Sequence, residues 1–426
     1  TLREMVRFDT VESRPAGDAP FGQGNKDCLN YALKKCEKMG MKTLNCDNYA
    51  GHADYGEGEE VLGILGHLDV VPAAEKTWIV PPFSGEIIDG KIYGRGTLDD
   101  KGPMVACMYA VKALIDSGVK FKRRVRLIFG CNEETGSRCM KYYFKKHPFP
   151  TLSFSPDANF PVINREKGML GLEFNLGKLP EEVTGFNAGL RKNIVPDECV
   201  ATIKKTFRGE ICKCIDVEEK ENEFLLTAKG VSAHASTPGE GDNAIWKMVK
   251  ALYKAFPGNK ALAFAAEKMC DFTGKAWGTD ISDNESGDIT VNLGIARFVD
   301  NELILTADIR HPITYTCRQV ADLFAKQSRG VKMTVLNESE PLHVPEESFL
   351  VQSLIKAYEK ATGEKGYSLA IGGGTYSRSC ENCVAFGPEF PGVKAPIHQA
   401  NECVEIDVLM RMAEIYMQAV KDICCE

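Results

Sequence analysis

Short apolar runs alternate with a helical pattern over the first part of the chain. Residues 61–65, 125–129 and 152–154 are rich in strand-forming side chains, and each run ends at a group of polar residues. Residues 103–117 carry apolar side chains at helical spacing, with a proline in the first turn and a glycine just beyond the end. Strands that alternate with helices predict an α/β domain built on a largely parallel sheet.

After Asn164 the pattern changes to longer strands with alternating apolar and polar positions. The expected strands of this region are residues 168–176, 199–207, 223–228 and 303–309, and the expected helices are residues 243–255 and 319–326. This mixture predicts a second unit of α+β type.

The α/β pattern returns towards the C-terminus, with a helix at residues 347–361, a strand at 384–386 and a closing helix from Ile406. We therefore expect a catalytic domain in two parts, residues 1–166 and 341–426, and an inserted α+β lid domain at residues 167–340.

The polar groups at the strand ends contain candidate metal ligands. His67 and Asp69 follow the first strand, Glu133 and Glu134 follow the second, and Asp157 follows the third. Each of these residues could instead be an ordinary polar residue of a solvated turn, with no metal bound. Because ligands of open α/β sheets bind at the carboxyl ends of the strands, we nevertheless expect these side chains to lie together.

Further candidates stand outside the strand ends. Asp99 and Asp100 precede the helix at residues 103–117, where an N-cap role would explain one of them, and His398 lies in a turn. Imidazole nitrogen and carboxylate oxygen suit zinc, manganese or cobalt better than calcium or magnesium. A centre of two metal ions needs about five protein ligands with one shared carboxylate, and the chain offers them.

The composition narrows the possible partners. Hydrophobic residues make up 44% of the chain and charged residues 26%, which is ordinary for a globular enzyme. The net charge of -7 leaves no basic surplus for phosphates, so nucleic acid is not an expected partner. No apolar segment is long enough to span a membrane and the first residues are charged, so we expect a cytoplasmic protein without a membrane partner.

The sixteen cysteines do not have the dense, regular spacing of a disulfide scaffold. Cys380 and Cys383 form a CxxC, but no second CxxC completes a site of four thiolates. We therefore expect most of the cysteines to be ordinary reduced thiols, rather than ligands of a structural zinc ion or redox-active groups.

Seven sequence motifs follow one another along the chain. They are GHLDVVP (66–72), YGRGTLDDKGP (93–103), NEETGS (132–137), SPDA (155–158), SAHAS (232–236), IGGGTY (371–376) and APIHQANE (395–402). In this order they resemble the metallopeptidase family that contains aminoacylase, carnosinase and carboxypeptidase G. The resemblance covers essentially the whole chain and implies a hydrolase with two metal ions and a lid domain.

The resemblance also implies five ligands for two divalent ions, with zinc as the expected metal and manganese or cobalt as alternatives. Asp99 would bridge the ions, His67 and Asp157 would complete one site, and Glu134 and His398 would complete the other.

Two further roles in the catalytic domain follow from the same similarity. Glu133 would be the general base that takes a proton from the attacking water, and Asp69 would hold the imidazole of His67 through its second ring nitrogen.

Lid residues of similar enzymes close over the substrate, and Asn193, His234 and Arg310 occupy the matching positions. His234 would stabilise the oxyanion, and the planar guanidinium of Arg310 suits bidentate capture of a terminal carboxylate. The backbone at Gly373 and Gly374 could approach a substrate closely.

The resemblance implies a dipeptidase that acts on short peptides with a free C-terminal carboxylate. An N-acyl-amino-acid amidohydrolase with the same metal centre remains an alternative, and a catalytically inactive binding protein is a second one. We expect a monomer, because a lid of residues 167–340 is long enough to supply from one chain what two chains supply in dimeric relatives. A dimer is the alternative.

Overall fold

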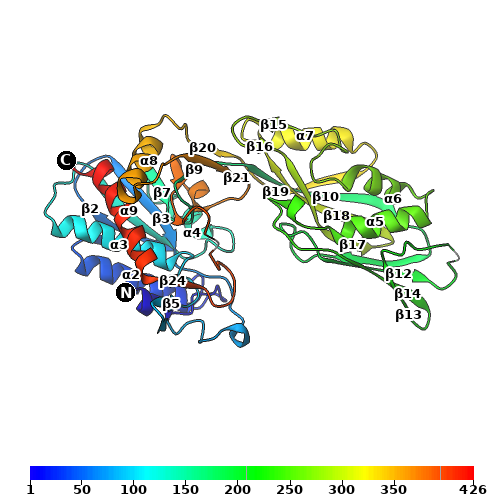
Figure 1. The fold of residues 1–426 in the computed structure, drawn as a ribbon, viewed down its shortest axis with the longest axis horizontal. Coiled ribbons are helices and arrows are strands. Elements are labelled where there is room, and N and C mark those ends of the chain that lie inside the picture. The colour runs from blue at the N-terminus through cyan, green and yellow to red at the C-terminus, as the bar shows by residue number, and fades with distance from the viewer. Residues whose placement is uncertain (208, 394) are drawn as a thin grey trace. The chain divides into compact units, whose positions relative to one another are not determined.

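The computed structural model describes residues 1–207, 209–393 and 395–426, which form two compact units (Figure 1). The first unit comprises Thr1–Asn164, Val344–Leu369 and Thr375–Glu426, and the second comprises Arg165–His343 and Ala370–Gly374. Among the described residues, no helix combines the length and the apolar character needed to cross a membrane.

The main sheet has parallel strands in its centre and antiparallel strands at both ends. Its order is β1-β2-β6-β3-β7-β22-β9-β20, and β21 pairs with β9. The bounds are β1 Lys42–Cys46, β2 Ala50–Tyr55, β3 Val61–His67, β6 Arg124–Gly130, β7 Leu152–Ser155, β9 Val162–Glu166, β20 Leu342–His343, β21 Ser368–Ile371 and β22 Cys383–Ala385. Short strands β4 Ile87–Ile88, β5 Lys91–Tyr93 and β24 Cys403–Glu405 form a separate sheet, and β8 Ala158–Asn159 pairs with β23 Pro388–Glu389.

The parallel centre of the sheet confirms the expected α/β fold class. Strand β3 runs parallel to β6 on one side and to β7 on the other, and β22 runs parallel to β7. Their residues are almost all buried, as expected for strands covered on both faces. The segments that follow β3, β6 and β7 therefore leave the sheet at the same edge.

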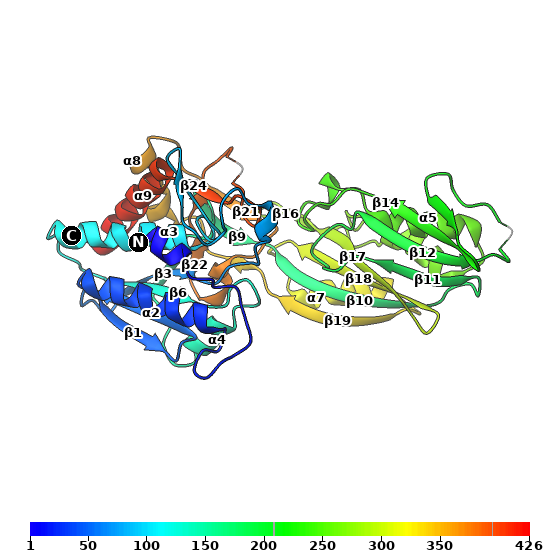
Figure 2. The ribbon, with the colours of Figure 1, turned by 90° about the horizontal axis from the view of Figure 1, so that it is seen from below.

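Helices of the first unit pack on this sheet and on one another. They are α1 Leu2–Val6, α2 Gln23–Lys38, α3 Lys101–Asp116, α4 Arg138–Tyr143, α8 Phe349–Thr362 and α9 Ile406–Cys424. Helix α3 packs against both β3 and α9, and α2 packs on β1 and β2 (Figures 1 and 2). Gly66 of β3 has no room for a Cβ, because Met104 and Asp100 of the α3 region occupy that space. This close approach brings the start of α3 against the end of β3.

The second unit is an antiparallel sheet of eight strands in the order β13-β14-β12-β11-β17-β18-β10-β19. The bounds are β10 Gly168–Lys178, β11 Val183–Ala188, β12 Glu198–Lys204, β13 Asp216–Glu219, β14 Glu223–Lys229, β17 Thr290–Val299, β18 Glu302–His311 and β19 Lys332–Ser339, with a small pair of β15 Ser282–Asp283 and β16 Gly287–Asp288.

The α-helices α5 Ala244–Ala255, α6 Lys260–Phe264 and α7 Cys317–Gln327 pack on the strands of the second unit. Helix α5 buries Ile245, Met248, Val249 and Leu252, which recur at helical spacing on one face. Its first turn is capped by the side chain of Asn243, which accepts a hydrogen bond from the amide of Ile245.

Candidate active site

Two groups of potential metal ligands lie beside one another in the first unit. One consists of His67, Asp99 and Asp157, the other consists of Asp99, Glu134 and His398, and within each group the ligand atoms lie within 4.8 Å of one another. These are the five residues that the resemblance implied as ligands. They come from the ends of β3, β6 and β7, from the start of α3 and from the segment before β24.

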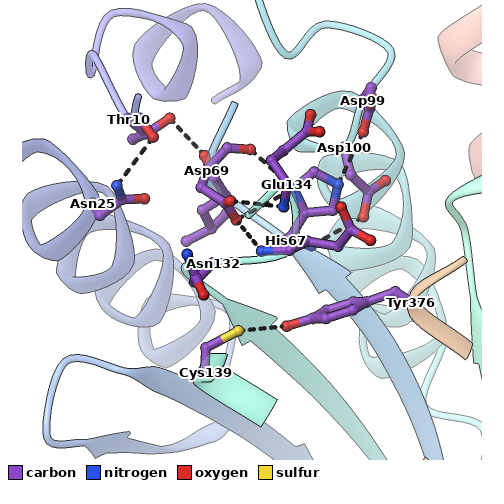
Figure 3. Close-up of polar contacts among 12 residues, drawn as sticks. Thr10, Asn25, His67, Asp69, Asp99, Asp100, Asn132, Glu134, Cys139 and Tyr376 are labelled. Carbon is purple, nitrogen blue, oxygen red and sulfur yellow. Dashed lines mark hydrogen bonds and ion pairs between the residues drawn. The ribbon is translucent and has the colours of Figure 1, made fainter. Parts of the chain in front are cut away.

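Asp99 belongs to both groups of ligands, and Figure 3 shows its contact with His67. Its Oδ1 atom is 2.9 Å from Nε2 of His67, and its Oδ2 atom is 2.8 Å from Nε2 of His398. Nε2 of His398 is also 3.0 Å from Oε1 of Glu134, and Nε2 of His67 is 3.9 Å from Oδ1 of Asp157. Each oxygen of Asp99 thus faces one imidazole, which is the arrangement that a carboxylate shared by two ions requires.

The cluster holds more carboxylate groups than imidazole groups, so its acidic side chains repel one another. Burial and the negative charges of Asp99 and Glu134 raise the pKa of Asp157 to about 6, and burial with the charge of Asp157 raises the pKa of Glu133 well above its usual range. Hydrogen bonds with Asp99 and Glu134 raise the pKa of His398 to about 10. Crowded carboxylates with two imidazoles form a donor set that fits divalent cations, because cations remove this repulsion.

Asp69 contacts both the imidazole of His67 and two backbone amides. The ring nitrogen Nδ1 of His67 is 2.9 Å from the backbone carbonyl oxygen of Asp69, while the carboxylate oxygen Oδ1 is 3.5 Å from that nitrogen. The shorter contacts of the buried carboxylate are with the backbone: the amide of Glu133 donates to Oδ1 at 2.9 Å and the amide of Glu134 donates to Oδ2 at 3.1 Å. The side chain of Asp69 therefore fixes the turn that carries both glutamates.

The support of the cluster includes Asp100, for which the sequence suggested a helix cap, and Arg95 and Glu402, which the sequence analysis did not single out. Asp100 occupies the N-cap position of α3 but makes no side-chain cap hydrogen bond, and its Oδ2 instead accepts from the backbone amide of His67 at 3.1 Å. Fully buried Glu402 accepts hydrogen bonds from Nη1 of Arg95 at 2.6 Å and from the amides of Gly96 and Leu98 at 3.0 and 2.9 Å. Glu402 thus joins the segment of His398 to the segment that leads into Asp99. The only available signal was their position inside the motifs.

The ring of Tyr376 packs against the imidazole ring of His67. The two rings are 5.9 Å apart in an edge-to-face arrangement, and the Tyr376 hydroxyl is 2.9 Å from Sγ of Cys139 (Figure 3). A Cβ on Gly130 would lie 1.8 Å from this hydroxyl, so the end of β6 must be glycine. The ring therefore helps to exclude water from the buried imidazole of His67.

In the second unit, His234 is exposed and its ring has a defined tautomer. The backbone amide of Ser236 donates to Nδ1 of His234 at 3.3 Å, so the neutral ring carries its proton on Nε2. The Ser236 hydroxyl lies 2.7 Å from the same nitrogen. Partial burial and the charge of Arg310 lower the pKa of His234, which favours the neutral form. The backbone carbonyl of Asn193 accepts from the amide of Ala235 at 3.0 Å, so the Asn193 and His234 segments are joined.

Arg310 lies at the end of β18 and is almost fully buried. Its Nε and Nη2 donate to the two carboxylate oxygens of Asp308, and Nη1 donates to the backbone carbonyl of Gly372 at 3.1 Å. Nζ of Lys192 lies 3.2 Å from Oδ2 of Asp308. Asp308 and Lys192 were not among the predicted site residues. Gly373 and Gly374 follow Gly372 in the segment Ala370–Gly374 of the same unit.

The imidazole and carboxylate groups at the carboxyl edge of the sheet form a candidate metal site of the kind found in hydrolases. Residues 63–422 match the family described as Peptidase family M20/M25/M40, and the chain belongs to this family of metallopeptidases. It is similar to the Bacillus subtilis protein named "Putative dipeptidase YtjP", with 36% identity over 99% of this chain and 96% of the relative. A Staphylococcus aureus protein, also named as a putative dipeptidase, is 34% identical over 100% of this chain and 96% of its own length.

Solved structures have the same fold at low sequence identity. An M20 family metallo-carboxypeptidase from Sulfolobus solfataricus has a TM-score of 0.59 at 17% identity, with coverage of 99% of this chain and 97% of its own. Human carnosine dipeptidase 1 has a TM-score of 0.58 at 15% identity, with coverage of 99% and 94%. These likenesses bear on the fold alone.

Proposed function

We propose that this peptidase is a metal-dependent dipeptidase that hydrolyses the amide bond of dipeptides with a free C-terminal carboxylate. The observation that carries the proposal is the pair of ligand groups that share Asp99. The dipeptidase names of relatives that match over nearly their whole length support the substrate class.

His67, Asp99 and Asp157 would hold one divalent ion, and Asp99, Glu134 and His398 would hold the other, with zinc as the expected metal. Bound there, the ions would lower the pKa of a water molecule and polarise the scissile carbonyl. The residues of the chain supply the remaining steps.

Glu133 is the proposed general base. Its turn is fixed by Asp69, and its acidic neighbours Asp157 and Glu134 act on its carboxyl group, so it lies beside the ligand cluster. Glu133 would take a proton from the attacking water and pass it to the leaving amine. Replacing Glu133 by Ala is expected to abolish turnover and leave the metal content intact, as measured by steady-state assays and elemental analysis. Loss of the metal together with activity would contradict this division of roles.

His234, Arg310 and Asn193 are the proposed substrate contacts of the second unit. The proton on Nε2 of His234 suits donation to the developing oxyanion, because Nδ1 is already occupied by Ser236. Arg310 is held by Asp308 and Gly372, which gives its guanidinium a fixed orientation for a terminal carboxylate. Asn193 and the backbone of Gly373 and Gly374 would complete the substrate site.

A substrate panel tests this proposal. Free dipeptides, the same dipeptides amidated at the C-terminus, tripeptides and N-acetylated amino acids are assayed with zinc, manganese and cobalt. We expect the highest kcat/KM for free dipeptides and a large loss on amidation. A preference for N-acetylated amino acids would instead support an amidohydrolase, and no hydrolysis in the presence of bound metal would support a binding protein.

We also propose that the active protein is a monomer. The support is the eight-stranded sheet that one chain builds in the second unit. Its edge strand β13 is exposed and carries Asp216, Glu218 and Glu219, which oppose pairing with the same edge of another copy. Light scattering over a concentration series should give the mass of one chain. A stable dimer, or activity restored by mixing His234→Ala and Glu133→Ala chains, would contradict the proposal.

A further inference from the structure

Two cysteines contact one another in the loop between β12 and β13 of the second unit. Cys212 and Cys214 are separated by Lys213, and their Sγ atoms lie 2.6 Å apart. Cys214 is exposed and Cys212 is partly exposed, whereas twelve of the sixteen cysteines are buried. This pair is therefore open to small reagents that most thiols of the chain do not meet.

The two sulfurs lie within direct contact of one another. Neither cysteine forms a disulfide with another residue, so both thiols are available to react. The loop thus holds the pair close enough for a sulfur–sulfur bond to form between them after a small movement.

The two thiols differ in their surroundings. The backbone amide of Cys214 donates to Sγ of Cys212 at 3.4 Å, which stabilises negative charge on Cys212. Hydrogen bonds from the side chain and the backbone of Cys214, with the charge of Lys254, lower the pKa of Cys212. The contact with Cys212 raises the pKa of Cys214. Cys212 is therefore the attacking thiolate and Cys214 the resolving thiol.

We propose that Cys212 and Cys214 are a redox-active dithiol that reduces low-molecular-weight disulfides by thiol–disulfide exchange. The Cys212 thiolate attacks one sulfur of the disulfide, whose sulfur–sulfur bond breaks, and one thiolate leaves and takes up a proton. Cys214 then loses its proton and attacks Sγ of Cys212 in the mixed disulfide, which releases the second thiol. The protein loses two electrons and two protons, the small disulfide gains both, and a bond joins Cys212 to Cys214.

The position of the pair favours a reversible bond over a permanent one. Only Lys213 separates the two cysteines, and Cys214 is exposed to solvent. Disulfides that are strained or exposed are the readily reduced ones. The five proposed metal ligands all belong to the first unit, so this activity does not depend on the proposed peptidase mechanism.

The test uses the reduced full-length protein and hydroxyethyl disulfide. After incubation, free thiols are blocked with N-ethylmaleimide and the protein is digested with trypsin, which cuts after Lys213. A bond between the cysteines then joins the peptides of residues 209–213 and 214–220, at the summed mass less two hydrogens. We expect this linked pair to dominate, with release of two thiols per chain. In the reduced protein, Cys212 should react with N-ethylmaleimide roughly tenfold faster than partly exposed Cys403.

Two variants give matched controls, and the thermal midpoint of each confirms that it folds. Cys214→Ser should accumulate a stable mixed disulfide at Cys212, because the resolving thiol is missing. Cys212→Ser should lose the fast reaction. The proposal is overturned if the two peptides stay unlinked, if both cysteines carry separate mixed disulfides, or if Cys212 reacts no faster than Cys403.

Discussion

Replacing Asp69 by Asn is expected to slow catalysis by displacing the two glutamates rather than by releasing His67. The Asp69 carboxylate accepts the amide hydrogens of Glu133 and Glu134 at 2.9 and 3.1 Å. The shorter contact to Nδ1 of His67, at 2.9 Å, comes from the backbone carbonyl of the same residue, which the substitution keeps, whereas the carboxylate oxygen lies 3.5 Å from that nitrogen. The variant therefore separates these two contacts.

The expected cost follows from the contacts of the buried carboxylate. The asparagine oxygen can replace one acceptor, but its NH₂ group must then face the second backbone amide. Loss of a hydrogen bond to a charged group costs about 1.5–3 kcal/mol, and a buried donor without a partner costs about 1–3 kcal/mol more. We expect the free energy of unfolding to fall by about 2.5–6 kcal/mol, and by less where the turn relaxes. The total stability of a protein is about 5–15 kcal/mol. A shift of about 1 Å in Glu133 would lower kcat roughly hundredfold.

The assay measures kcat on a free dipeptide at saturating metal, together with urea unfolding. The matched control is Asp116→Asn, since Asp116 is 61% exposed and pairs with Lys112 on the surface of α3. This control should change stability by less than about 1 kcal/mol. Full kcat at saturating metal in the Asp69 variant would refute the reasoning, because the carboxylate would then act only on metal affinity through His67.

Three further perturbations test the remaining contacts. His234→Ala should lower kcat by about 10²–10³-fold with little change in KM, and an unchanged kcat in steady-state assays would remove His234 from the mechanism. Asp308→Asn leaves buried Arg310 without its ion pair, so the kcat/KM ratio of free to amidated dipeptides should fall, with a loss of stability of about 3–5 kcal/mol. An unchanged ratio would contradict the clamp. Removal of metal by a chelator should destabilise the protein, and free zinc at about 100 times its Kd should restore about 2.7 kcal/mol in urea unfolding. An equal stability with and without zinc would contradict the metal centre.

The centre of the first unit was predictable because its strands are buried on both faces. The apolar runs at 61–65, 125–129 and 152–154 correspond to β3, β6 and β7, although β3 extends to His67. In the second unit, the strands that were not predicted are β11, β13, β15, β16, β17 and β19, and the two longest of these, β17 and β19, show the physical reason. The pairing of β17 with β18 shifts register between Leu293 and Ile295, which interrupts the alternation, and most side chains of β19 are exposed. Neither strand therefore has a regular apolar period.

The candidate site was predictable for those residues whose side chain can bind a metal and which stand at the end of a buried strand. His67, Glu134 and Asp157 follow buried strands, and the structure brings them together with Asp99 and His398. The partner of the Asp69 carboxylate could not be predicted, because backbone amides are present at every residue other than proline. Only the path of the turn after β6 determines which amides reach it.

One charged neighbour of Arg310 is close to it in the sequence, and the other is far from it along the chain. Asp308 and Arg310 are two residues apart on β18, so their side chains point to the same face, and this pair could have been read from the sequence. Lys192 comes from 116 residues away along the chain, held where Asn292 donates to its backbone carbonyl at 2.9 Å. Asp308 offsets the charge of only one of the two cations. The group of three thus keeps a net positive charge, which is what capture of a substrate carboxylate requires.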